Sequence, residues 1–184
     1  MSRLTKRLFL MLSLTAVAVA VAGVGSASAA QTGSCVFTGL AGNLTPGVPA
    51  ATNPAGPLAT GTYSFSGDAL NCALANSNGT VIANGGAHIT SSGSYLNLLC
   101  GTGTATGTAT VAFSNGQTFS NIGYTIAFAG GTGALAVTSG ATGGGEVSIV
   151  PGDVPAPVGA GSGGNCVTTA VTQFKVYGNF TAVV

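Results

Sequence analysis

The chain has 184 residues, which suits one domain, and carries only four Lys or Arg and three Asp or Glu residues. Outside the first 30 residues Lys175 is the single basic side chain, and one lysine cannot neutralise a phosphate backbone. Nucleic-acid binding is therefore excluded. His88 is the only imidazole, too few for a His/Cys metal site, and no cofactor is expected.

Residues 1–30 have the pattern of a secretory signal peptide. Three basic residues occupy the first seven positions, an apolar stretch covers 8–22, and small residues lead to the A-x-A motif Ala27-Ser28-Ala29. We expect cleavage near Ala29 or Ala30. A retained membrane anchor is the alternative, but the apolar stretch is shorter than the roughly 20 residues of a membrane span. No stable membrane span is expected in the mature chain.

Residues 31–184 then form a single secreted domain, for which the sequence predicts an all-β fold. In 122–128 every even position is large and apolar and every odd position is small or polar, which is the alternation of a half-buried strand. The 31 glycines of the chain disfavour long helices. The sequence predicts eight strands, near 35–41, 61–72, 79–90, 94–113, 117–129, 133–139, 145–151 and 168–182.

Short glycine-containing segments along the chain indicate hairpin turns. The predicted turns are Asn78-Gly79, Gly85-Gly86, Ser92-Gly93, Asn115-Gly116, Gly130-Gly131 and Gly143-Gly144-Gly145. Two longer loops are predicted over 42–60 and 151–166. A succession of hairpins without helical crossovers favours antiparallel strands in a barrel, with a β-sandwich as the alternative.

Four cysteines remain in the mature chain, namely Cys35, Cys72, Cys100 and Cys166. An even number in an exported chain predicts two disulfides, and four cysteines allow three pairings. We favour Cys35–Cys72, facing each other across a hairpin, together with Cys100–Cys166. No C-x-x-C motif and no neighbouring cation indicates a reactive thiol.

Threonine occupies every second position from Thr102 to Thr110, which places five hydroxyls on one face of a strand. A threonine array that binds ice or a polysaccharide needs parallel rows from several strands. The sequence displays one row and no repeat, so a solvent-facing strand is the favoured interpretation.

No catalytic constellation is predicted. His88 alternates with Ile89 and is expected to face solvent, and no G-x-S-x-G motif accompanies it. Asp68 and Glu146 fall on the polar sides of their strands, and Asp153 lies in a Pro-flanked loop, so a facing carboxylate pair for glycoside cleavage is not expected. The interpretation is that the protein is not an enzyme.

Three segments carry a resemblance to known proteins: Cys100-Gly101-Thr102-Gly103-Thr104, the run 124–133, and Gly143-Gly144-Gly145-Glu146-Val147. They resemble a family of small secreted Gly/Thr-rich β-proteins of high-GC Gram-positive bacteria. The turn over 130–133 is also similar to one in allene-oxide-cyclase-like and dirigent-like barrels. This local similarity implies a barrel. It implies no cyclase activity, since the charged residues which those barrels use have no counterpart here.

The expected function is that of a secreted, disulfide-stabilised, non-catalytic β domain with a structural or binding role at or near the cell surface. Two alternatives stay open. A barrel of this size can carry a small apolar ligand in its interior. Low charge and exposed strand edges would instead suit a subunit of a surface layer or fibre.

Overall fold

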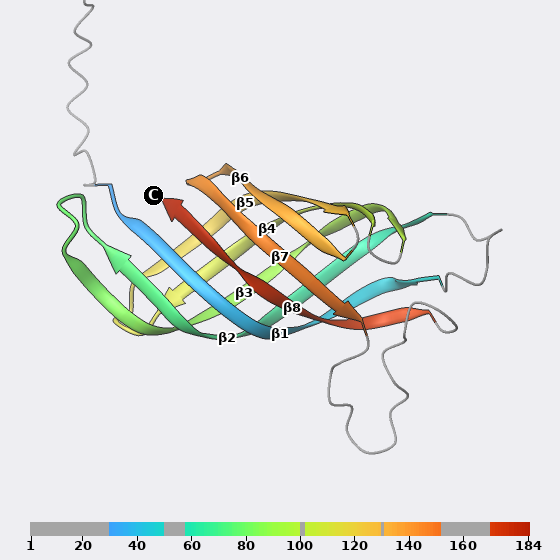
Figure 1. The fold of residues 1–184 in the computed structure, drawn as a ribbon, viewed down its shortest axis with the longest axis horizontal. Coiled ribbons are helices and arrows are strands. Elements are labelled where there is room, and N and C mark those ends of the chain that lie inside the picture. Colours follow the sequence, from blue (N-terminus) through green and yellow to red (C-terminus); the bar gives the residue numbers. More distant parts are fainter. Residues whose placement is uncertain (1–29, 50–57, 100–101, 130, 152–169) are drawn as a thin grey trace, which may run out of the picture.

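The computed structural model describes residues 30–49, 58–99, 102–129, 131–151 and 170–184. These residues form eight antiparallel strands and a closed barrel, in which each strand pairs with its sequence neighbours and β8 pairs with β1 (Figure 1). The strands are β1 (Thr32–Val48), β2 (Ala59–Ala75), β3 (Val81–Leu99), β4 (Thr102–Phe113), β5 (Thr118–Ala129), β6 (Thr132–Ser139), β7 (Thr142–Pro151) and β8 (Val171–Val183). The all-β prediction and its eight antiparallel strands are confirmed, as a barrel. The described ranges contain no helix long and apolar enough to cross a membrane.

Alternation of side chains along the strands fills the barrel. In β5, Ile122, Tyr124, Ile126 and Phe128 are all buried, as their period of two predicts. Corresponding positions on the other strands complete one apolar core, whose largest fully buried side chains are Tyr95, Phe174, Leu40 and Leu74. An eight-stranded barrel is just wide enough for such side chains to fill it.

Several predicted turns lie inside strands. Gly85-Gly86 and Ser92-Gly93 are both within β3, and Gly143-Gly144-Gly145 belongs to β7. The predicted division of this region into strands 79–90 and 94–113 is therefore wrong, because β3 continues unbroken to Leu99. Glycine marks turns when it supplies a special backbone conformation, but in this barrel it also supplies space beside a neighbouring strand.

Two predicted turns are confirmed by their local chemistry. The Asn78 side chain accepts a hydrogen bond of 2.9 Å from the Thr80 amide, and Asn115 accepts one of 3.0 Å from the Gln117 amide. These are Asx-type contacts, in which the side chain closes the turn. The predicted loop 42–60 is shorter than expected, since β1 extends to Val48 and β2 begins at Ala59.

The predicted bridge between Cys35 and Cys72 is confirmed. The two residues face each other in the β1–β2 ladder and form a disulfide with their Cα atoms 4.1 Å apart. Cys100, Cys166 and the predicted cleavage site at Ala29 lie outside the described residues, so the second bridge stays a prediction. Leu99 ends β3 and Pro151 ends β7, and both strand ends lie at the same end of the antiparallel barrel.

Candidate functional site

Three groups of polar side chains in the described part of the barrel bear on the sequence predictions: a buried tyrosine row, the exposed His88–Asp68 pair and an outer wall of hydroxyls. The buried row crosses four strands. Tyr63 on β2 faces Gly93 on β3, Gly93 faces Gly107 on β4, and Gly107 faces Tyr124 on β5. Because neither glycine has a side chain, the two tyrosines meet above them, and the Tyr63 hydroxyl donates a 2.6 Å hydrogen bond to Tyr124.

Every hydroxyl in this row has a partner. Tyr124 hydrogen-bonds to Ser91, whose hydroxyl donates a 2.9 Å bond to the Thr108 carbonyl oxygen. In the described part of the barrel, no buried side-chain nitrogen or oxygen lacks a partner. Burial raises the pKa of Tyr63 and also that of Tyr124. The row is therefore a neutral, closed structural network, and it offers no group to a ligand.

Alkaline pH should destabilise the barrel through these two phenols. Their pKa values are raised in the folded state, whereas unfolded tyrosines ionise near pH 10. Above about pH 10 the unfolded chain binds fewer protons than the folded one, so the free energy of unfolding falls as pH rises. Urea denaturation from about pH 8 to about pH 11 measures this slope. Tyr124→Phe should make the slope shallower, and an unchanged slope in that variant would contradict the assignment.

Where side chains are described, the voids inside the barrel are small. Two apolar voids lie inside the barrel, with volumes of about 30 and 50 Å³, and Phe65, Ile126, Val147 and Val176 line both. Binding sites for small organic ligands usually measure about 300–1,000 Å³. These voids are therefore packing gaps on the scale of water molecules.

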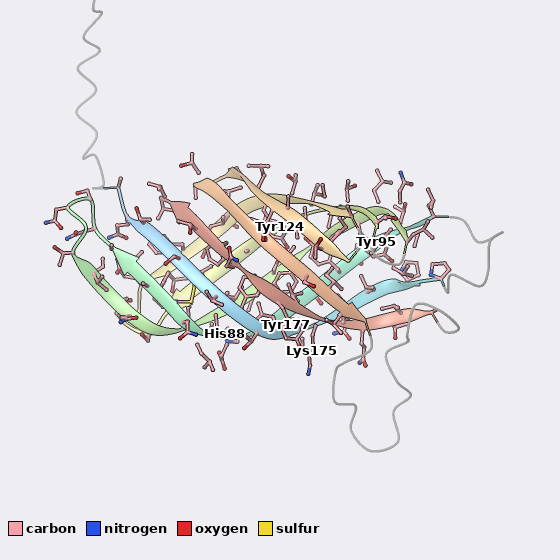
Figure 2. The ribbon with its side chains drawn as sticks, in the orientation of Figure 1. His88, Tyr95, Tyr124, Lys175 and Tyr177 are labelled. Atoms are coloured by element: carbon pink, nitrogen blue, oxygen red, sulfur yellow. A yellow bond between two sulfur atoms is a disulfide. The ribbon has the colours of Figure 1, made fainter. Side chains whose placement is uncertain are left out.

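His88 and Asp68 form a pair that the alternation of side chains along each strand did not reveal. Both side chains face outward as predicted, but β2–β3 register places them opposite each other, with His88 Nδ1 2.7 Å from Asp68 Oδ1. Their side chains are 54% and 74% exposed, and Figure 2 shows His88 on the outside of the wall. Across the described residues, the hydrogen bonds of His88 include no serine or threonine hydroxyl, so the pair lacks the nucleophile of a triad.

The remaining predicted residues are dispersed. Glu146 is exposed on β7, and Lys175 on β8 points away from the barrel in Figure 2. Asp153 lies outside the described residues. Where side chains are described, no three His, Cys, Asp or Glu residues come together to hold a metal ion.

The threonine row of β4 is part of a larger surface than the sequence indicated. Beside it, β3 presents Thr90, Ser92 and Ser94, and β2 presents Thr62, Ser64 and Ser66, all of them exposed. The ladders align these side chains in three crosswise rows. The rows are Thr62–Ser94–Thr106, Ser64–Ser92–Thr108 and Ser66–Thr90–Thr110.

We call these nine residues the hydroxyl grid. Its spacing follows from sheet geometry, about 4.8 Å between strands and about 6.8 Å between alternate residues along a strand. Within it, Ser94 and Thr106 hydrogen-bond to each other at 3.2 Å. The expectation of a single row was therefore wrong. It failed because strand register brings serines of β2 and β3 into line with threonines of β4.

The comparisons with known proteins add no relationship. No protein-family model matches the sequence, and no curated protein or solved structure is recognisably similar to it. The resemblance to secreted Gly/Thr-rich β-proteins and to dirigent-like barrels stays a prediction.

Proposed function

We propose that the protein is a secreted, non-catalytic binding module, which attaches to neutral polysaccharide at or near the cell surface through the hydroxyl grid. The observation that carries this proposal is the alignment of nine Ser and Thr hydroxyls across β2, β3 and β4. A hydroxyl offers one donor and two acceptors, which matches the hydrogen-bonding groups of a sugar polymer. Within the grid, Thr62 donates to the Thr45 carbonyl oxygen at 3.4 Å, and Ser94 and Thr106 share one hydrogen bond.

The grid has no charge, which suits an uncharged ligand. Its one charged neighbour is the His88–Asp68 pair, in the next crosswise row after Ser66 and Thr90. The outer wall of a closed barrel is convex, because its strands tilt and curve around the axis. A convex wall suits a flexible polymer chain, which can follow it, better than a flat crystal surface such as ice.

Several observations favour binding over catalysis. The tyrosine row is buried and its hydroxyls are satisfied. The His88–Asp68 pair is open to water and has no hydroxyl partner among the residues described. Catalytic groups generally act from a water-excluding site with a positioned nucleophile or acid–base pair, and neither group has that setting.

The two alternative functions lose their structural motivation. An apolar ligand inside the barrel would need several times the volume of the voids of about 30 and 50 Å³. Fibre assembly through exposed edges would need an unpaired strand, whereas each of the eight described strands has two partners. A cell-surface binding role keeps its support, because the grid lies on the outside.

Affinity electrophoresis through gels containing dextran or another neutral polysaccharide tests the proposed function. The protein should be retarded, and Ser92→Lys, at the centre of the grid, should weaken retardation at least about ten-fold by placing a long charged side chain among the hydroxyls. Thr138→Lys is the matched control, since it adds the same charge at an exposed position of β6. Equal retardation of the two variants would contradict the role of the grid.

Export is tested separately. Expression of the full chain in a Gram-positive host should release a protein that begins near residue 30 or 31, as mass spectrometry of the culture medium can determine. An uncleaved chain retained in the cells would contradict the prediction of a secreted domain.

A further inference from the structure

A groove on the outer wall of β5–β8 lies across the barrel from the hydroxyl grid and has a volume of about 540 Å³. This volume lies within the usual range for small-molecule sites. An outer barrel wall is generally convex, so a hollow of this size needs a local cause. Small outward residues provide it: Ala127 on β5 and Ala134 on β6 face each other in the ladder and form the floor.

Polar groups surround this floor. Glu146 on β7 lies opposite both Ala134 and Asn179 of β8, so a carboxylate and an amide stand side by side above the alanines. Thr132 and Ser148, which also face each other, add two hydroxyls along the groove. The lining therefore combines the Glu146 carboxylate, the Asn179 amide and the hydroxyls of Thr132 and Ser148 with a small apolar floor, and Tyr177 of β8 also lines the groove.

Glu146 and Asn179 are available to a ligand. In the part of the chain that the structure describes, neither side chain has a hydrogen-bond or ion-pair partner. Thr132 donates to the Ala129 carbonyl oxygen at 3.1 Å, and Ser148 donates to the Gly131 carbonyl oxygen at 3.5 Å, so both hydroxyls keep their acceptor lone pairs free. The acceptors outnumber the donors here, which favours a ligand that is rich in N–H and O–H groups.

We infer that this groove binds a protonated amino sugar, whose ammonium group pairs with Glu146. The ammonium would make a charge-assisted hydrogen bond to the carboxylate, the strongest type of contact that this groove offers. Ring hydroxyls would bond to Asn179, Thr132 and Ser148, and the apolar face of the ring would lie on Ala127 and Ala134. The inference goes beyond the proposed function, since it adds a second, charge-selective saccharide site on the opposite wall.

The test is a titration of the ¹⁵N-labelled mature protein with glucosamine at low ionic strength, in which amide chemical shifts report binding. Shifts should occur in 132–134, 146–148 and 177–179, with a dissociation constant on the order of 1 mM. N-acetylglucosamine and glucose, which lack the ammonium, should bind at least about ten-fold more weakly. Methylamine, which lacks the ring, should also bind at least about ten-fold more weakly, and equal binding by methylamine would overturn the assignment of an amino sugar.

Two variants locate the site. Glu146→Gln keeps the shape of the side chain and removes its charge, and should weaken glucosamine binding at least about ten-fold. Asp68→Asn is its matched control, because it removes one exposed carboxylate from the distant β2–β3 wall. Ala134→Leu fills the floor without any change of charge and should abolish binding. Unchanged affinity in Glu146→Gln or in Ala134→Leu would overturn the inference.

Failure of this inference can be distinguished from failure of the proposed function. Ser92→Lys should lose retardation by polysaccharide and keep the glucosamine shifts. Glu146→Gln should keep retardation by polysaccharide and lose the glucosamine shifts. Loss of both polysaccharide retardation and glucosamine binding in Ser92→Lys, with an otherwise unchanged amide spectrum, would contradict the assignment of two separate sites.

Discussion

Gly93→Ala should lower the free energy of unfolding by about 3 kcal/mol, because the added methyl group has no space. A Cβ atom at position 93 would lie 2.0 Å from the Thr106 carbonyl oxygen and 2.7 Å from the Tyr63 hydroxyl. The first contact is with backbone, so β3 and β4 would have to separate locally. The second would displace Tyr63 from its hydrogen bond to Tyr124 and leave a buried acceptor without its partner.

Gly86→Ala, in the same strand, is the matched control. The nearest atom to its added Cβ would be the Ala69 carbonyl oxygen at 3.6 Å, an ordinary contact. Alanine also reduces the conformational entropy of the unfolded chain, so this variant should be neutral or stabilised by up to about 1 kcal/mol. Urea denaturation followed by circular dichroism measures both changes. Equal stability of the two variants would contradict the steric argument.

Around the barrel, other inward-facing glycines also leave space for a large side chain of the neighbouring strand, and this pairing accounts for much of the glycine in its strands. Gly42 faces Phe65 on one side and Phe174 on the other, and Gly133 faces Phe128. Gly178 faces Phe37 in the β1–β8 ladder. A narrow eight-stranded interior cannot hold a large side chain at every inward position, so aromatic rings lie over neighbouring glycines.

Sequence predictions of side-chain direction and of turns succeeded where they depended on one strand and failed where they depended on the neighbouring strand. Alternation within one strand is local, and it correctly predicted the buried face of 122–128 and the outward direction of His88, Asp68 and Glu146. A glycine next to a polar residue is ambiguous, because Asn78-Gly79 forms a turn and Ser92-Gly93 lies in a strand. Only the neighbouring strand, where Tyr63 needs the space, distinguishes the second case from the first.

Cross-strand features required register, which the sequence alone did not provide. The five threonines of β4 form a row that the sequence itself displays, but the alignment of Thr108 with Ser92 and Ser64 depends on how β3 and β2 pair. The His88–Asp68 contact and the Glu146–Asn179 pair arise in the same way. A one-residue slip in any ladder would send these side chains to the other face of the sheet.

Closure of the barrel also changed the interpretation of individual residues. An outward lysine on an unpaired edge strand can protect that edge against further strand pairing, and Lys175 alternates with the buried residues Phe174 and Val176. In the closed ladder it lies between Val150 of β7 and Ala41 of β1, so β8 has no free edge at this position. The outward charge of Lys175 instead contributes to the solubility of a wall that is largely uncharged.

Replacing both Cys35 and Cys72 by alanine should lower the free energy of unfolding by ~4 kcal/mol in the chain-entropy model. The bridge spans 37 residues, and its loss lets the unfolded chain explore many more conformations. The folded state should change little, since the β1–β2 ladder continues on both sides of the pair. Urea denaturation of the double variant measures the loss, and a decrease of less than about 1 kcal/mol would contradict this account.

The same double variant also tests the second predicted bridge. Added reductant should destabilise it further if Cys100 and Cys166 are paired, because that bridge would close a still longer segment of chain. A thiol count under denaturing, non-reducing conditions should then find no free thiol in either the natural chain or the variant. Two free thiols in both proteins would show that Cys35–Cys72 is the only bridge, and the stability of the barrel would rest on its packed interior and this single cross-link.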